Sequence, residues 1–151
     1  MYATVAQAKE YIEQYYSSTD PLRKAWEELS EQDQLVLLNR AEQSIDGLPL
    51  RGCPLVKGKA FPRTPFQETS LQSAKIATIE LALSSLNVEA SERLSLRRQG
   101  VKSYKIGDLS ETFVDSNAGV STAVYALLIV SPYLADWLGG GYRICPTQTR
   151  K

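Results

Sequence analysis

A chain of 151 residues with 43% hydrophobic residues is long enough to form one domain with a buried core. Its 17 basic and 17 acidic residues give zero net charge, which argues against a molecule whose whole surface binds nucleic acid. The absence of histidine removes the commonest general base and metal ligand, and two distant cysteines cannot form a zinc site on their own.

The first 46 residues predict three helices, because apolar residues recur at helical spacing behind suitable capping residues. Asp20 followed by Pro21 is typical of a helix start, and Ser30 with Asp33 resembles a capping box. Gly47 should end the third helix. The expected N-caps are Thr4, Asp20 and Ser30, and the expected helices end near Tyr16, Leu29 and Ile45.

The stretch 44–66 separates two strong helical patterns and contains four prolines and three glycines, so neither a helix nor a central strand can run through it. Apolar residues are nevertheless spaced along it, which argues against disorder. We therefore expect an Ω-type loop packed on its neighbours. Its apolar residues are Leu48, Leu50, Leu55, Val56, Phe61 and Phe66.

After this loop, a long helix should run from about residue 65 or 69 to 86, and its apolar residues on two sides place it centrally in the fold. Residues 87–100 are polar and basic, and we expect a mobile arm. Residues 101–114 predict a β-hairpin around a Gly107-Asp108 turn. A hairpin of two strands is marginal in water alone, so it should lean on the helices or on another chain.

The run 122–137 is apolar on all sides and predicts a buried last helix, which Pro132 should kink or restart. The fold class is therefore mainly α: a small helical bundle with a long Pro/Gly-rich loop and one projecting β-hairpin. We expect a single domain over 1–151. Its parts are a helical core (4–86 and 120–138), an arm and hairpin (88–115) and a flexible C-terminal tail (139–151).

Motifs for catalysis are missing, so we expect no enzyme, no cofactor and no metal site. Gly139-Gly-Gly141 is not followed by the residues of a phosphate-binding loop. Nothing supplies a base for Cys53, which we interpret as a buried small apolar residue. Reduced cysteines are expected, although a bridge between Cys53 and Cys145 stays open. We expect no secretory leader, because the first residues contain neither a basic nor an apolar segment, and the longest apolar run is too short to cross a membrane.

Charge is unevenly distributed, with nine acids and four bases in residues 1–46 but ten bases and four acids in 47–105. This segregation either registers an assembly or reflects ordinary solvated surfaces. Bases interleaved with aromatics can also bind single-stranded nucleic acid, although we favour aromatics in the core. One such cluster is Arg51, Lys57, Lys59 and Arg63 with Phe61 and Phe66; the other is Arg93, Arg97, Arg98, Lys102 and Lys105 with Tyr104.

Several patterns in a fixed order resemble the head–tail adaptor (connector) proteins of long-tailed bacteriophages. They are Ala41-Glu-Gln-Ser-Ile-Asp-Gly-Leu-Pro-Leu-Arg-Gly52, Phe61-Pro-Arg63, an alanine-rich helix, Gln99-Gly-Val-Lys-Ser-Tyr-Lys-Ile-Gly-Asp-Leu-Ser-Glu-Thr-Phe113, and Pro132-Tyr-Leu134 before a glycine-rich end. The resemblance spans the chain from its first helix to Gly141. Some proteins of this group are labelled DnaT-like single-stranded-DNA-binding proteins, so single-stranded-DNA binding is the alternative function.

The resemblance implies a virion structural protein that forms a homo-oligomeric ring, commonly of twelve copies, in the neck of the particle. The ring would be assembled in the host cytoplasm, without a membrane, between the portal protein and a head-completion, stopper or tail-terminator protein. Genomic DNA would pass through it non-specifically.

Four groups of site residues follow from this resemblance. They are a subunit-interface loop (Asp46, Leu50, Arg51, Phe61, Arg63), a hairpin facing the channel or next ring (Lys102, Tyr104, Lys105, Asp108), a portal-docking tail (Tyr142, Arg143, Ile144, Arg150) and DNA-facing bases (Lys57, Lys59, Arg97, Arg98).

Overall fold

The protein is described by a computed structural model that places residues 1–64, 67–87, 92, 103–106, 109–112 and 122–138. Within these residues the fold is mainly helical, as the sequence predicts. The helices are α1 (Val5–Tyr15), α2 (Pro21–Glu27), α3 (Glu31–Asp46), α4 (Gln67–Ser84) and α6 (Thr122–Leu134), and a 3-10 turn η1 (Ala135–Trp137) follows α6.

The first three helices begin at the predicted caps. Thr4 accepts a hydrogen bond from the N–H of Gln7, whose side chain accepts one from the N–H of Thr4 in return, which completes a capping box. The carboxylate of Asp20 and the hydroxyl of Ser30 accept hydrogen bonds from backbone N–H groups at the starts of α2 and α3, without the reciprocal bond of a capping box. Each cap satisfies N–H groups that a helix end would otherwise leave without a partner.

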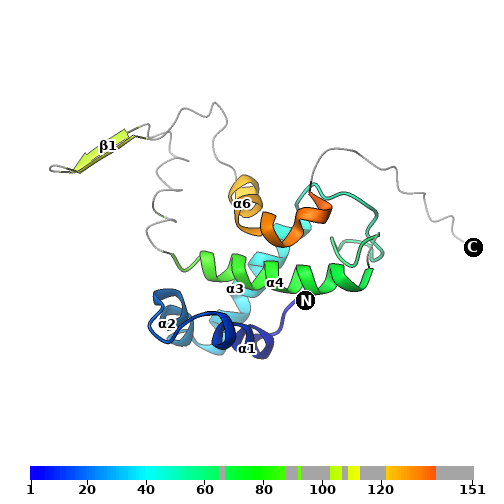
Figure 1. The fold of residues 1–151 in the computed structure, drawn as a ribbon, viewed down its shortest axis with the longest axis horizontal. Coiled ribbons are helices and arrows are strands. Elements are labelled where there is room, and N and C mark those ends of the chain that lie inside the picture. The colour runs from blue at the N-terminus through cyan, green and yellow to red at the C-terminus, as the bar shows by residue number, and fades with distance from the viewer. Residues whose placement is uncertain (65–66, 88–91, 93–102, 107–108, 113–121, 139–151) are drawn as a thin grey trace, which may run out of the picture.

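Helix α4 is the centre of the fold, as its two apolar sides predict. It packs against α6, α3 and α2, and Figure 1 shows it crossing the middle of the molecule between α6 and the α1–α2 pair. Small side chains on α4 allow close packing of these neighbours. The fully buried residues of α4 are Ser70, Ala74, Ala77, Thr78, Ile79, Ala82 and Leu83.

Helix α6 differs from its prediction in two ways. It is one helix that continues through Pro132 to Leu134, so it does not restart after the proline. Proline cannot donate a backbone hydrogen bond to the carbonyl of Leu128, but the hydroxyl of Ser131 donates to that oxygen at 3.2 Å. The helix is also not buried on all sides, because Leu128 is 67% exposed while Val130 is fully buried.

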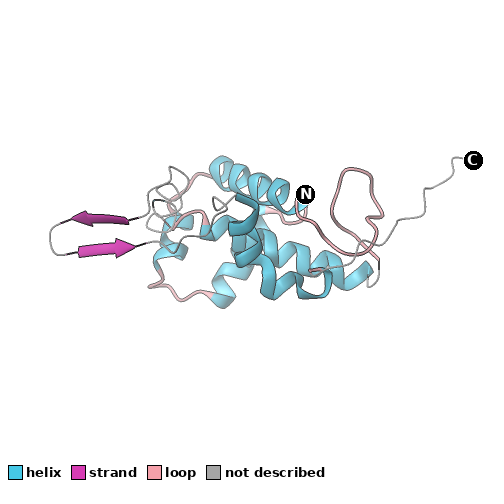
Figure 2. Cartoon of the chain, turned by 90° about the horizontal axis from the view of Figure 1, so that it is seen from above, coloured by secondary structure: helices cyan, strands magenta, loops and turns pink. Residues whose placement is uncertain are grey.

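Strands β1 (Ser103–Ile106) and β2 (Leu109–Thr112) pair antiparallel, with Ser103 opposite Thr112 and Ile106 opposite Leu109. Figure 2 shows the pair at one end of the molecule, beyond the helices. The predicted turn at 107–108, the arm at 88–100, apart from residue 92, and the tail at 139–151 lie outside the described residues.

The core includes residues from outside the helices. Trp26, Phe61 and Trp137 are its largest buried side chains, and Phe61 comes from the loop between α3 and α4. Ala3, which precedes α1, is also buried. Among the helices of the described residues, none is long and apolar enough to cross a membrane.

Candidate functional site

The loop between α3 and α4, residues 47–66, follows a fixed path over residues 47–64. It is closed by an antiparallel bridge between Pro54 and Arg63 and by a hydrogen bond from the N–H of Leu55 to the carbonyl of Pro62 at 2.9 Å. The Phe61–Pro62 peptide bond is cis. The N–H of Arg51 also bonds the carbonyl of Trp137 at 2.7 Å, so the loop is attached to the end of the chain's last described turn.

Arg63 holds the loop together from inside. Its guanidinium donates four hydrogen bonds of 2.7–2.9 Å, all to backbone carbonyls of the loop: those of Leu50, Arg51, Gly52 and Ala60. The side chain is only 7% exposed, and burial lowers the pKa of the guanidinium, which nevertheless stays protonated. Arg63 therefore acts within its own subunit, where it orders the loop that the sequence predicts to form the subunit interface.

Phe61 attaches the loop to the core. Its ring is 1% exposed and lies edge-on to the rings of Tyr2 and Trp137, at centroid distances of 6.0 and 5.5 Å. This confirms the interpretation of Phe61 as a core residue. The ring is therefore packed inside the subunit and not at the outer surface of the loop.

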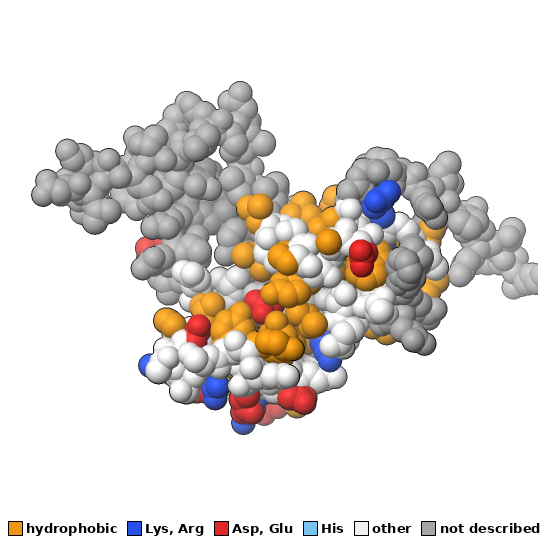
Figure 3. Space-filling model, in the orientation of Figure 1, with side chains coloured by type: hydrophobic (Ala, Val, Ile, Leu, Met, Phe, Trp, Pro, Cys, Tyr) orange, Lys and Arg blue, Asp and Glu red, His pale blue; other side chains and the backbone are white. Residues whose placement is uncertain are grey.

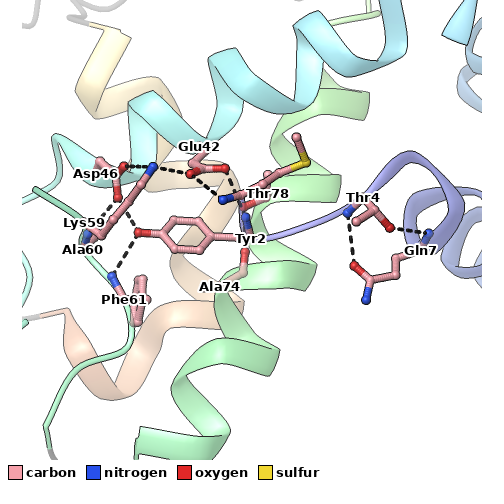
Figure 4. A network of polar contacts seen from close by, with 11 residues as sticks. Tyr2, Thr4, Gln7, Glu42, Asp46, Lys59, Ala60, Phe61, Ala74 and Thr78 are labelled. Carbon is pink, nitrogen blue, oxygen red and sulfur yellow. Dashed lines mark hydrogen bonds and ion pairs between the residues drawn. The ribbon is translucent and has the colours of Figure 1, made fainter. Parts of the chain in front are cut away.

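A polar network fixes the base of the loop to α3 (Figure 4). Lys59 forms ion pairs with Glu42 and, at 3.2 Å, with Asp46. Asp46 also accepts hydrogen bonds from the N–H of Ala60, at 2.7 Å, and from the hydroxyl of Tyr2. That hydroxyl accepts in turn from the N–H of Phe61 at 3.0 Å, so Tyr2 bridges α3 and the loop.

The same network binds the start of the chain. Glu42 is buried and accepts from the N–H of Tyr2 at 3.0 Å, and the N-terminal amine of Met1 lies 3.3 Å from its carboxylate. Burial alone would raise the pKa of Glu42, but the hydrogen bonds from Lys59, Tyr2 and the N-terminus outweigh it and lower the pKa. The pKa of its partner Lys59 is raised, because the hydrogen bond to Glu42 and the one to Asp46 favour the charged amine.

The tip of the loop is the part that faces outward. We call residues 54–58 the knob. Leu55 is 39% exposed, Val56 is 48% exposed, and Lys57 and Gly58 are also exposed. Gly58 has a φ of +78°, which only glycine adopts without strain, and it allows the chain to turn back toward Lys59. The knob is therefore a short apolar and basic projection on a rigid base.

A second surface feature was not foreseen from the sequence. Helix α4 carries Glu80, whose two carboxylate oxygens accept hydrogen bonds from the hydroxyls of Tyr11 and Tyr16 at 2.7 and 2.8 Å. Burial, followed by these bonds to Glu80, raises the pKa of both tyrosines. Tyr133 of α6 lies beside them, and burial and the charge of Glu80 raise its pKa as well.

Tyr15 extends this cluster into solvent. Its ring lies against that of Tyr11 at a centroid distance of 4.6 Å and is 64% exposed. We call the surface formed by Tyr11, Tyr15, Tyr16, Glu80 and Tyr133 the tyrosine patch. Figure 3 shows apolar side chains gathered in the middle of the face between the α1–α2 pair and α6. In the sequence, only the closeness of Tyr11, Tyr15 and Tyr16 at the end of the first helix could have indicated this patch.

The predicted site residues are only partly brought together. Asp46, Leu50, Phe61 and Arg63 lie around the base of the loop, where Lys59, whose side chain is 40% exposed, pairs with Asp46. Arg51 and Lys57 remain exposed. Tyr104 and Lys105 lie on β1, although their side chains are not described. The other predicted site residues lie outside the described residues: Lys102, Asp108, Arg97, Arg98, Tyr142, Arg143, Ile144 and Arg150.

Cys53 differs from its expected state. It is half-buried and disulfide-bonded, so it is neither a free thiol nor a fully buried apolar residue. Its N–H donates to the hydroxyl of Thr64 at 3.3 Å, and its carbonyl accepts from the N–H of Thr64 at 3.0 Å. Cys53 thus belongs to the closure of the loop.

The polar side chains of the loop and of the tyrosine patch are held by hydrogen bonds and ion pairs. In the described part of the chain, every buried polar side-chain atom has a hydrogen-bond partner, and no group of three or more acidic or cysteine residues could hold a metal ion. Several polar groups at the base of the loop are bound within the subunit, whereas the knob and Tyr15 of the tyrosine patch are exposed. No protein-family model, curated protein or solved structure matches the chain.

Proposed function

We propose that this chain is a structural protein of a bacteriophage particle: a head–tail adaptor that forms a ring, of about twelve copies, between the portal protein and the next neck or tail component. The proposal begins from the order of the sequence patterns that resemble this family. A projecting β1–β2 hairpin would face the channel or the next ring, and the tail from residue 139 would dock on the portal.

The observation that carries the proposal is the construction of the α3–α4 loop. Four carbonyls bound by Arg63, the buried ring of Phe61 and the Lys59 ion pairs fix its base in one conformation. An assembly contact gains affinity when its surface is ordered before binding, because less conformational entropy is lost. A rigid loop with an apolar, basic tip suits a contact between protein subunits.

The alternative function, binding of single-stranded DNA, is less well supported by this loop. Base stacking needs exposed aromatic rings, but Phe61 is buried. Arg63 is fully engaged with carbonyls, and Lys59 is paired with two carboxylates. Only Arg51 and Lys57 of the four bases in the loop remain for phosphate contacts.

The decisive experiment removes the protein during particle assembly. Without it, we expect DNA-filled heads that fail to hold a tail, and complementation with the wild-type chain should restore attachment. Purified complete particles should contain the chain in a fixed ratio to the portal. Normal tails in its absence, or particles that lack the chain, would contradict the proposal.

A further inference from the structure

Two exposed features of this protein are complementary but lie on different parts of the molecule. The knob offers the apolar side chains of Leu55 and Val56 next to the base Lys57. The tyrosine patch offers aromatic rings around the carboxylate of Glu80. One surface is apolar and basic, and the other is aromatic and acidic.

Within the described part of the chain, the charged groups of the knob and of the tyrosine patch form no ion pair. There, Glu80 forms hydrogen bonds with tyrosines but no ion pair with a lysine or arginine, and Lys57 has no ion pair either. The tyrosine hydroxyls hold the Glu80 carboxylate in place at the surface of α4. A negative charge without a basic partner, set among apolar rings, favours a basic ligand with an apolar body.

The two surfaces are too far apart to meet in one subunit. The knob lies ahead of α4, which starts at Gln67, whereas Glu80 lies 13 residues further along that helix. At ~1.5 Å per residue this is roughly 20 Å along the helix axis. Figure 1 shows the α3–α4 loop and the α1–α2 pair at different places around α4.

We infer that the knob of one copy docks on the tyrosine patch of the next copy, with Leu55 and Val56 against the rings of Tyr11 and Tyr15 and Lys57 beside Glu80. The inference rests on the proposed function and supplies its lateral contact. Because the two surfaces differ from each other, the contact is heterologous, and repeating it generates a closed ring when the rotation between copies permits. Tyrosine is enriched at the centres of protein interfaces, as it is in this patch.

The test uses two substitutions at exposed positions, which should leave the fold intact. Leu55→Asp disables the knob, and Tyr15→Asp disables the patch. Each variant alone should self-associate about tenfold or more weakly than the wild type in sedimentation velocity. Val36→Asp, at a 42% exposed apolar position on α3, is the matched control and should associate like the wild type.

Mixing the two variants distinguishes this contact from any other. The Tyr15→Asp chain keeps an intact knob and the Leu55→Asp chain keeps an intact patch, so an equal mixture should form a one-to-one dimer and nothing larger. A mixture that stays monomeric overturns the contact, as does unchanged association of either variant. A wild-type chain that remains monomeric at about 1 mM overturns it as well.

A photo-crosslink identifies the partner surface directly. Benzoyl-phenylalanine at position 55 should react with the tryptic peptide that spans residues 10–23, and only between copies, as a mixture of isotope-labelled and unlabelled chains will show. A crosslink within one copy, or to another peptide, overturns the contact. If complete particles still contain the chain, the proposed function survives that result; if they lack the chain while the contact forms, the proposed function alone fails.

Discussion

Single residues decide the shape of the α3–α4 loop, and Phe61 is the first of them. Its ring fills a space between Tyr2 and Trp137 and is 1% exposed. Phe61→Ala should lower the free energy of unfolding by about 3–5 kcal/mol, from lost burial and from the cavity it leaves. Urea denaturation measures this. Leu55→Ala, at the exposed knob, should change it by less than ~0.5 kcal/mol; equal effects of the two substitutions would refute the burial of Phe61.

Arg63 is a second such residue, and a lysine cannot replace it. Lysine keeps the charge but has three donors on one nitrogen, which cannot reach four carbonyls arranged around a planar fork. Arg63→Lys should cost about 2–3 kcal/mol, because buried carbonyls lose their partners. It should also expose the bond after Lys57 to trypsin in a limited digest. Arg51→Lys, at an exposed position nearby, is the control. If the two variant chains resist trypsin equally, the hydrogen bonds of the Arg63 guanidinium do not order the loop.

Glu42 makes stability depend on acidity. Its pKa is lower in the folded chain than the ordinary value of 4.5, because Lys59, Tyr2 and the N-terminal amine bind its charged form. The unfolded state therefore takes up this proton first as the pH falls, and stability present above pH 4.5 is lost as the pH drops through the folded-state pKa.

Glu42→Gln isolates this contribution. At neutral pH the variant should unfold with about 2 kcal/mol less free energy than the wild type, because an uncharged amide pairs poorly with Lys59. The gap should narrow as the pH falls below 4.5, which urea denaturation across that range will measure. A gap that is the same at neutral and acidic pH would show that the charge of Glu42 does not stabilise the fold.

The sequence reveals local interactions of residues better than distant ones. Thr4, Asp20 and Ser30 are predictable because a cap bonds to an N–H two or three residues away. The burial of Arg63 was not predictable, because a base in a Pro/Gly-rich loop is ordinarily solvated. Its four partners are carbonyls, which every residue carries and no sequence pattern distinguishes. The burial of Glu42 was not predictable for a related reason, because its partners lie far away in the sequence, at the N-terminus and in the loop.

Helices, like single residues, are predictable from the sequence where they depend on local interactions. The bounds of the first helices depend on local signals and were predicted well, as was the central place of α4 with its two apolar sides. The path of α6 was not, because the effect of Pro132 depends on whether another donor reaches the carbonyl of Leu128. The hydroxyl of Ser131 does so here. A proline pattern alone does not contain that information.

The contribution of the hydrogen bond from Ser131 to Leu128 can be measured with a double-mutant cycle. Ser131→Ala should cost about 0.5–1 kcal/mol in the wild type, because Leu128 loses its hydrogen bond. In a Pro132→Ala background the same change should cost almost nothing, because the new N–H bonds that carbonyl itself. Thermal unfolding of the four chains gives the coupling. Equal costs in both backgrounds would mean that the Ser131 hydroxyl does not compensate for the proline.

For the whole molecule, the structure shows which of the unevenly distributed charged residues act inside the subunit and which lie at its surface. The basic residues of the α3–α4 loop divide into those that hold the subunit together, Arg63 and Lys59, and those left outside, Arg51 and Lys57. The acidic residues divide likewise: Glu42 and Asp46 act inside, while Glu80 lies at a surface of tyrosines. The exposed Lys57 and the carboxylate of Glu80 are therefore opposite in charge, which suits the head-to-tail contact that we propose between copies.

The division of the basic residues into engaged and exposed ones also predicts how weakly the protein binds nucleic acid. Counterion release makes non-specific DNA binding grow with the number of free basic side chains, and the chain has zero net charge. With Arg63 and Lys59 engaged and Phe61 buried, we expect no saturable binding of a single-stranded oligonucleotide at ~50 mM salt. Fluorescence anisotropy measures this, with Lys57→Glu as a matched variant that should behave like the wild type. Tight binding that weakens steeply with salt, and that Lys57→Glu reduces, would instead favour the DNA-binding alternative over the adaptor, because the loop would then be presenting its bases to phosphate rather than to a neighbouring copy.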